Sequence, residues 1–220
     1  MERHRRLDTE LEDLRSRLLL LGGETETALQ RAMHALNERD DAAAHEVLDG
    51  DDAIDRMEVE IDRHCIDILA LRQPAARDLR FVMSVTKISP ILERIADHAC
   101  NIARAAVDLN DEPQLKFFAE LPRMALQASA MLRSALDAFT KGDAAASRGV
   151  IEQDDEIDRM YERLFNDLIE LMAEEPPAAR RAARLLFVAK HLERVADYVT
   201  DICELTVYMT EAAVIKHSKA

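Results

Sequence analysis

Apolar residues recur every three or four positions along most of the chain, which is the spacing of helices that bury one face. Turn and N-cap residues around 37–41 and proline-rich or Gly-Asp breaks further on separate the periodic stretches. The pattern predicts six long helices, over about 7–36, 42–71, 74–109, 114–140, 143–173 and 178–215. Pro74 is expected to begin the third helix, where its missing N–H costs nothing. Long helices joined by short loops pack antiparallel, so we expect an all-α fold.

Three short motifs of the first half return in the second half in the same order. Residues 51–57, 74–77 and 92–97 recur as residues 154–160, 177–180 and 192–197. The first two pairs are offset by 103 residues and the third by 100, so the second copy lacks three residues between Arg180 and Glu193. We therefore predict a tandem repeat of two antiparallel three-helix bundles, residues 1–112 and 113–220, separated at the break 110–113.

Composition and charge exclude some classes of function for this chain. Gly (5) and Pro (6) are scarce, aromatic residues make up 4%, and the net charge is −14, so the chain lacks the basic footprint of a nucleic-acid-binding protein. No apolar stretch approaches 18 residues, which argues against direct membrane insertion. Three isolated cysteines, Cys65, Cys100 and Cys203, are expected as core residues of a reduced cytoplasmic protein. Cations or basic protein surfaces are the natural partners of such a charge.

The repeated motifs carry carboxylates four residues apart, which places each pair on one helix face. The candidate metal ligands are Asp51, Asp55, Glu93 and Asp97 in the first copy and Asp154, Asp158, Glu193 and Asp197 in the second. Like charges at this spacing destabilise a helix unless a cation compensates them. Carboxylates favour hard divalent ions, so Mg, Mn, Fe or Zn is expected, with the ion's identity open. Helical phase places these acids on the flank of each bundle, beside the core and open to water.

No pattern of an active site accompanies these acids. His98 follows Asp97 and could reach a metal, but the second copy has Tyr198 there, and a partly exposed helix residue is the simpler interpretation. His191 begins a stretch that superficially resembles a phospho-accepting helix, yet the first copy has Ile91 at this place. The chain has no phosphate-binding glycine loop, and neither copy has Glu-x-x-His at the repeated acid. We therefore predict a protein that is not an enzyme. A metal-dependent carboxylate-bundle enzyme, a metal store and a metal-free helical scaffold stay open as alternatives.

Several linked motifs resemble the PhoU family over about residues 7–212. They are Leu-Arg-Gln-Pro-Ala-Ala-Arg-Asp-Leu-Arg at 71–80, Leu-Glu-Arg-Ile-Ala-Asp-His at 92–98 with Asn-Ile-Ala at 101–103, the acidic motif at 51–55 and the second Leu-Glu-Arg-Val-Ala-Asp. The resemblance implies metal binding at the eight carboxylates named above. This chain departs from the family at Ala96 and Ala196, where glycine is usual, and at Pro90, which is expected to re-aim the first site.

The resemblance also implies a function. PhoU-like proteins are cytoplasmic accessory proteins of phosphate uptake, held at the inner membrane only through partners. They repress the phosphate-starvation response by linking the ATPase subunit of a phosphate ABC transporter to a membrane sensor histidine kinase, and homodimers are common among them. Regulation of a sodium–phosphate cotransporter is the alternative within the same family.

Overall fold

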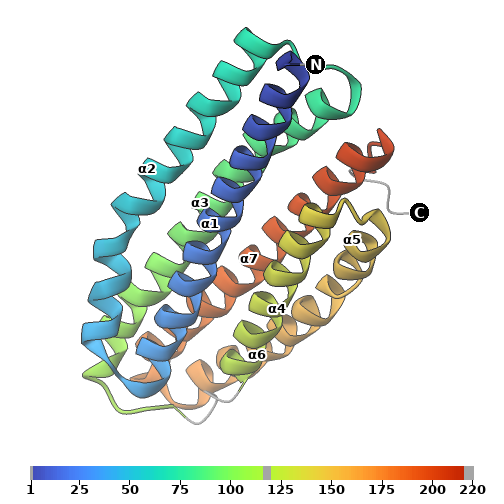
Figure 1. Cartoon of the computed structure of the whole chain (residues 1–220). Helices are drawn as coiled ribbons and strands as arrows, with labels where there is room; N and C mark the ends of the chain where they lie inside the picture. Colours follow the sequence, from blue (N-terminus) through green and yellow to red (C-terminus); the bar gives the residue numbers. More distant parts are fainter. Residues whose placement is uncertain (1, 116–119, 216–220) are drawn as a thin grey trace.

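The computed structural model describes residues 2–115 and 120–215 and contains helices joined by short connections, without a strand in those ranges. Figure 1 shows their arrangement. The helices are α1 (Glu2–Glu38), α2 (Asp41–Arg72), α3 (Ala76–Asn110), α4 (Glu120–Lys141), α5 (Ala144–Ile151), α6 (Asp154–Glu174), the 3₁₀ turn η2 (Pro176–Ala178) and α7 (Ala179–Glu211). No helix in the described part of the chain is both long enough and apolar enough to cross a bilayer.

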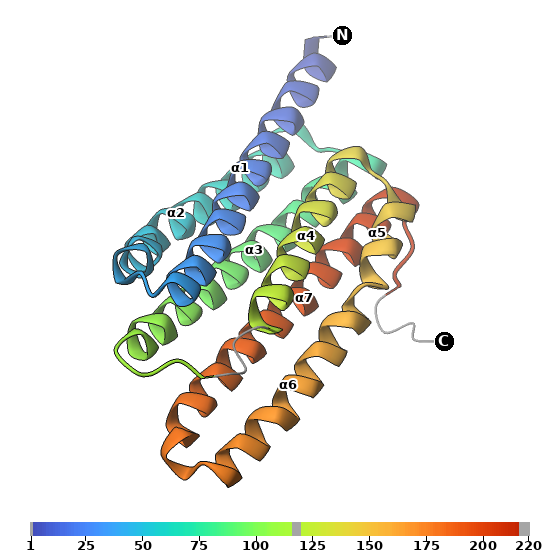
Figure 2. The same ribbon diagram turned by 90° about the horizontal axis from the view of Figure 1, so that it is seen from below.

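The helices form two three-helix bundles, as predicted. The first contains α1, α2 and α3, and the second contains α4, α7 and the consecutive helices α5 and α6. The bundles meet through α3 and α7 in the middle of the molecule, with a second contact between α1 and α4 (Figure 2). This arrangement leaves α2 and α6 on the two outer flanks. The predicted boundary at 112/113 falls in the segment that follows α3 and stays a prediction.

In each repeat an aspartate caps the start of the second helix. Asp40 accepts a hydrogen bond from the Ala43 N–H at 3.1 Å, and Asp143 accepts one from the Ala146 N–H at 2.9 Å. Each side chain satisfies a backbone donor that the first helical turn leaves without a partner. The start of the third helix was predicted two residues early. Gln73 ends α2 in the left-handed conformation (φ 53°), and Ala75 is extended (φ −128°, ψ 156°), so α3 begins at Ala76 rather than at Pro74.

The second copy differs from the prediction of one helix over 143–173. It has two helices there, because the backbone tightens at Glu152 and Gln153. The Gln153 N–H bonds to the Val150 carbonyl at 3.0 Å, an i→i−3 bond that replaces the regular helical one. The last helix is also shorter than the predicted 178–215: it ends at Glu211, followed by Ala212 in the left-handed conformation (φ 57°).

A continuous apolar core joins the two bundles. Phe81 of α3 stacks on Phe139 of α4 with 5.7 Å between ring centroids. At the α1–α4 contact Gly22 gives Leu136 room, since a Cβ at Gly22 would lie 2.5 Å from Leu136 Cδ1. The three cysteines are all buried in this core, as predicted. Burial raises the pKa of each thiol to about 12, so all three are unreactive at neutral pH.

The packing of α3 on α7 is antiparallel and symmetric. Residues 80, 84 and 98 of α3 lie against residues 209, 205 and 191 of α7. Equivalent positions of the two copies differ by 100 in this region. The crossing is therefore centred between positions 94 and 95 on α3 and between 194 and 195 on α7. Each copy presents the same stripe to the other, which is the geometry of a pseudo-two-fold axis.

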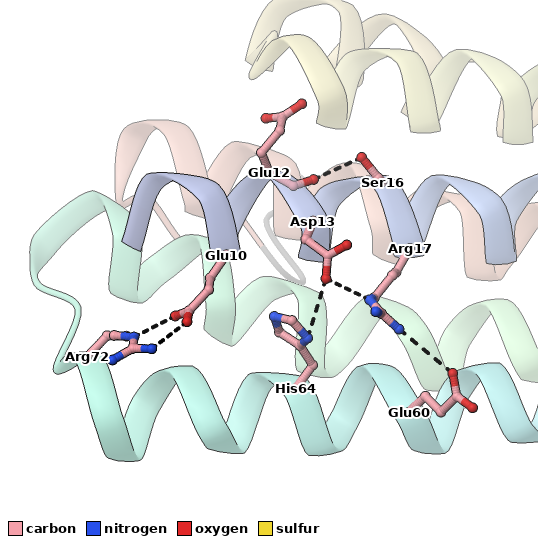
Figure 3. A network of polar contacts seen from close by, with 8 residues as sticks. All are labelled: Glu10, Glu12, Asp13, Ser16, Arg17, Glu60, His64 and Arg72. Carbon is pink, nitrogen blue, oxygen red and sulfur yellow. Dashed lines mark hydrogen bonds and ion pairs between the residues drawn. The ribbon is translucent and has the colours of Figure 1, made fainter. Parts of the chain in front are cut away.

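Polar contacts hold α2 against α1 in the first bundle (Figure 3). Arg72 donates two hydrogen bonds to the Glu10 carboxylate, at 2.6 and 2.8 Å, and holds the pKa of that carboxyl below its usual value. Further along, Asp13 pairs with Arg17 at 2.8 Å and with His64 at 3.6 Å. These contacts fix the position of α2, and with it the acidic row that α2 carries.

Candidate metal centres

The first acidic group lies on the flank between α2 and α3. Asp51 and Asp55 extend from α2, and Glu93 and Asp97 extend from α3. Partial burial raises the pKa of Asp55, and the neighbouring Asp51 and Asp97 raise it further. Burial also raises the pKa of Glu93, assisted by Asp97 and Asp55. All four side chains predicted from the repeat therefore lie close enough to repel one another.

Glu58 is a further member of this group and is not among the eight carboxylates predicted from the sequence. It lies one turn after Asp55 on α2. Burial is the main cause that raises the pKa of Glu58, and the charges of Asp62 and Asp55 raise it further. Glu58 in turn raises the pKa of Glu93. The sequence could have indicated Glu58, because it belongs to the same acidic row of the helix as Asp51 and Asp55. Comparison of the repeats passes over it, since the equivalent position in the second copy is Tyr161.

The second acidic group lies on the flank between α6 and α7. Burial raises the pKa of Asp154 to about 6, and the charges of Asp158, Asp197 and Glu193 add to the effect. The Oδ1 atom of Asp154 is buried and has no hydrogen-bond partner in the structure. A buried carboxylate oxygen without a donor is costly, and a cation or a bound proton would compensate it. The four predicted residues of the second copy are thus also brought together.

These groups supply the right atoms for a hard divalent cation, but their side chains are not arranged as a finished site. No three His, Cys, Asp or Glu side chains in the described part of the chain converge on one point as metal ligands would. Their carboxylate oxygens, solvent access and uncompensated charge nevertheless suit Mg²⁺ or Mn²⁺, which keep several waters when they bind. Binding would require the side chains to rotate toward a shared ion.

The two acidic groups differ in the Lys and Arg side chains that pair with their carboxylates. In the second copy Lys190 Nζ lies 2.6 Å from Glu193 Oε2 as an ion pair, although without the angles of a hydrogen bond, and Arg194 contacts Asp197 at 3.0 Å. The first copy has Pro90 at the position of Lys190, so no lysine can reach Glu93 from there. The second group is therefore partly neutralised by the protein itself, while the first keeps more of its negative charge.

A histidine pair lies between the two groups. The Nδ1 atoms of His98 and His191 are 2.9 Å apart, across the α3–α7 contact. Burial, His191 and Arg194 lower the pKa of His98 to about 4, and burial lowers the pKa of His191. Both imidazoles are therefore neutral at pH 7, and the ring that carries its hydrogen on Nδ1 donates a hydrogen bond to the Nδ1 atom of the other. The sequence offers no signal for this contact, which depends on the register between the two bundles.

The comparisons with known proteins agree with this architecture. A family model described as the PhoU domain matches the chain twice, over residues 18–106 and 121–206. The chain belongs to the PhoU family. A protein of Pseudomonas aeruginosa named "Phosphate-specific transport system accessory protein PhoU homolog" is 37% identical over 211 residues, 96% of this chain and 87% of its own length. A homologue of the same name from Aquifex aeolicus is 37% identical over 212 residues, 96% of each chain.

Crystal structures of two PhoU proteins have the same fold. PhoU of Pseudomonas aeruginosa superposes with a TM-score of 0.91 at 38% identity, covering 94% of this chain and 99% of its own. PhoU of Streptococcus pneumoniae, described as a phosphate transport system regulatory protein, superposes with a TM-score of 0.88 at 31% identity, covering 94% and 98%. This chain therefore contains two PhoU domains and has a role in the regulation of phosphate transport, and both acidic groups lie within these domains.

Proposed function

We propose that this chain is a non-enzymatic cytoplasmic regulator that represses the phosphate-starvation response when phosphate is plentiful. In this role it links the ATPase subunit of a phosphate ABC transporter to a membrane sensor histidine kinase. Membership of the PhoU family supports the transport role, because relatives sharing 37% of the sequence are named as accessory proteins of phosphate-specific transport.

Divalent cations at the two acidic flanks are part of this proposal. Asp51, Asp55, Glu93 and Asp97 would hold one ion or a small cluster, assisted by Glu58, and the equivalent acids of the second repeat would hold another. A bound ion supplies positive charge between two helices that otherwise repel each other there. The observation that carries this part is the mutual repulsion of the carboxylates on α2 and α3, repeated on α6 and α7.

The function is tested by alkaline phosphatase output in phosphate-rich medium. A bacterium that lacks its own PhoU is compared with and without this gene, and expression of a folded protein is checked by immunoblotting. Repression restored by the gene is the expected result. Continued high output from a folded protein would overturn the proposed role in that signalling system.

Metal binding needs a separate test, because repression alone does not report it. The Glu93→Gln/Asp97→Asn variant is compared with wild type by elemental analysis after dialysis against Mn²⁺ and by the shift in melting temperature that Mn²⁺ causes. The variant is expected to lose part of both signals. Equal metal content and equal shifts would contradict the proposed ligands while leaving the regulatory role intact. Light scattering on the same samples tests the homodimer that the family resemblance predicts.

A further inference from the structure

The two repeats differ most clearly on the outer flank beside their acidic groups. In the second repeat Tyr161 and Phe165 lie one turn apart on α6, with 6.2 Å between ring centroids, and Lys190 of α7 lies over the Tyr161 ring at 5.2 Å. Figure 2 shows that α6 and α7 run antiparallel. Because Lys190 lies over the Tyr161 ring, the turn after Tyr161 on α6 and the turn before Lys190 on α7 lie at the same level of the flank. Phe165 and Phe187 occupy these turns and therefore extend one apolar surface.

Three apolar residues of this surface are well exposed to solvent. The side chain of Phe187 is 66% exposed, that of Ile169 is 45% exposed and that of Phe165 is 39% exposed. An aromatic side chain left in water forgoes the stabilisation that its burial would provide. Exposed apolar residues that gather on one face, rather than lying scattered, mark interaction surfaces. We call the surface formed by Tyr161, Phe165, Ile169 and Phe187 the aromatic flank.

The first repeat provides an internal comparison. At the positions equivalent to Tyr161, Phe165 and Phe187 it has Glu58, Asp62 and Lys87, so the same place on the fold is charged there. Ile66, the equivalent of Ile169, is also exposed but lacks the aromatic neighbours. Helices α2 and α6 nevertheless bury equivalent positions beside the two flanks: Ile54, Ile61 and Ile68 on α2, and Ile157, Leu164 and Leu171 on α6. The fold therefore does not require aromatic residues on this flank.

The surroundings of the aromatic flank indicate the kind of partner. Helix α6 carries eight acidic residues and two arginines, a net charge of −6 over 21 residues. A second copy of this chain placed on the flank would bring two such helices together, which like charges oppose. A basic amphipathic helix would instead place its apolar side chains on the aromatic residues and its Lys or Arg residues beside the acids.

We propose that the aromatic flank of α6 and α7 is a docking surface for a basic amphipathic helix of a partner protein. The proposal rests on the regulatory function proposed above, because it assigns a surface to one of the partner contacts which that function needs. Aromatic side chains near the centre of an interface carry much of the binding free energy, and the acidic rim steers a basic partner and makes the association sensitive to salt. Only the second repeat offers this surface.

The test uses the full chain and a fluorescein-labelled synthetic peptide, an 18-residue amphipathic helix with Leu and Phe on one face and Lys and Arg on the other. Fluorescence anisotropy is measured with wild type, with Phe165→Ser/Phe187→Ser, and with the matched control Asp62→Ser/Lys87→Ser, which changes the equivalent positions of the first repeat without altering net charge. We expect the aromatic variant to bind at least about tenfold more weakly and the control to bind like wild type. Circular dichroism checks that all three are folded.

Three results would overturn the proposal. The first is equal binding of the peptide by wild type and the aromatic variant, and the second is equal binding of a peptide in which Glu replaces every Lys and Arg. The third is a lower molecular mass of the aromatic variant in light scattering, which would assign the flank to a second copy of this chain. The phosphatase assay then separates the two proposals. If the aromatic variant no longer binds the peptide but still represses alkaline phosphatase, the aromatic flank is a docking surface that the regulatory role does not need.

Discussion

Replacing the adjacent glycines of α1 by alanine is expected to change stability in different ways. Both lie inside the helix, where alanine is favoured over glycine by about 1 kcal/mol. At Gly23 nothing lies within 4 Å of a new Cβ, so the Gly23→Ala variant should gain about 0.5–1 kcal/mol. At Gly22 the new Cβ would lie 2.5 Å from Leu136 Cδ1 and 3.1 Å from Cδ2, well inside van der Waals contact.

The clash at Gly22 determines how much stability the Gly22→Ala variant should lose. Leu136 is buried in the contact between the two repeats, so its side chain cannot move outward without repacking α4. Overpacking of this kind costs about 1–3 kcal/mol. We therefore expect Gly22→Ala to be less stable than Gly23→Ala by about 1–3 kcal/mol. In a chain of this length that difference corresponds to roughly 2–12 °C in melting temperature.

The assay is urea denaturation followed by circular dichroism at 222 nm, with thermal melts in the same metal-free buffer. A double-mutant cycle identifies the cause, because Leu136→Ala removes the atoms that clash. In that background Gly22→Ala should behave like Gly23→Ala. Equal stability of the two single variants in the wild-type background would refute the close approach of α1 and α4 at Gly22.

Three other predictions concern the acidic flank and a helix cap. In EDTA, Asp154→Asn should raise stability by about 2 kcal/mol at pH 7.5 and have little effect at pH 4. The native carboxyl has a pKa of about 6 against 3.8 in the unfolded chain, so wild-type stability falls as pH rises between these values. Lys190→Met should enlarge the Mn²⁺-induced increase in melting temperature, since it frees Glu193 from its ion pair. Asp40→Ala should lower the free energy of unfolding by about 1 kcal/mol, because the Ala43 N–H loses its acceptor.

Each of these has a matched control or a contradicting result. Asp155→Asn removes a charge next to Asp154, and a pH dependence lost equally in both variants would contradict the role of burial. An unchanged Mn²⁺ response in Lys190→Met would mean that the ammonium does not compete for Glu193. For the cap, the matched control is Asp40→Asn, which keeps a side-chain oxygen that can accept the hydrogen bond from the Ala43 N–H. Equal losses in the two cap variants, measured by urea denaturation, would contradict the capping argument.

The repeat and the helical period predict most of the fold because both can be read directly from the order of residues along the chain. Pairs such as Asp40 and Asp143 begin equivalent helices, and the carboxylates four residues apart necessarily share a face. The break at Glu152 and Gln153 was missed because neither residue disfavours a helix. The start of α3 was placed two residues early, since the left-handed conformation of Gln73 carries no glycine or asparagine signal.

The candidate site was predictable only within each repeat. Repetition identified the carboxylates, but it passed over Glu58, whose equivalent is an aromatic residue. Contacts between the repeats depend on how far α3 is shifted along α7, which is set by side-chain packing across the whole interface. The pairing of His98 with His191 follows from that shift, so neither histidine taken alone indicated it.

The symmetric crossing of α3 and α7 also bears on how the two flanks could become different. Two separate identical units meeting through this stripe would form an isologous pair, in which every contact occurs twice. Covalent linkage keeps the partners together at a high effective concentration, so each contact no longer has to be self-complementary. His98 and His191 accordingly meet on one side of the axis, while the counterpart positions hold Ile91 and Tyr198. The joined chain can carry an aromatic flank on one half and charged residues at the equivalent place on the other, a polarity that a pair of identical units lacks.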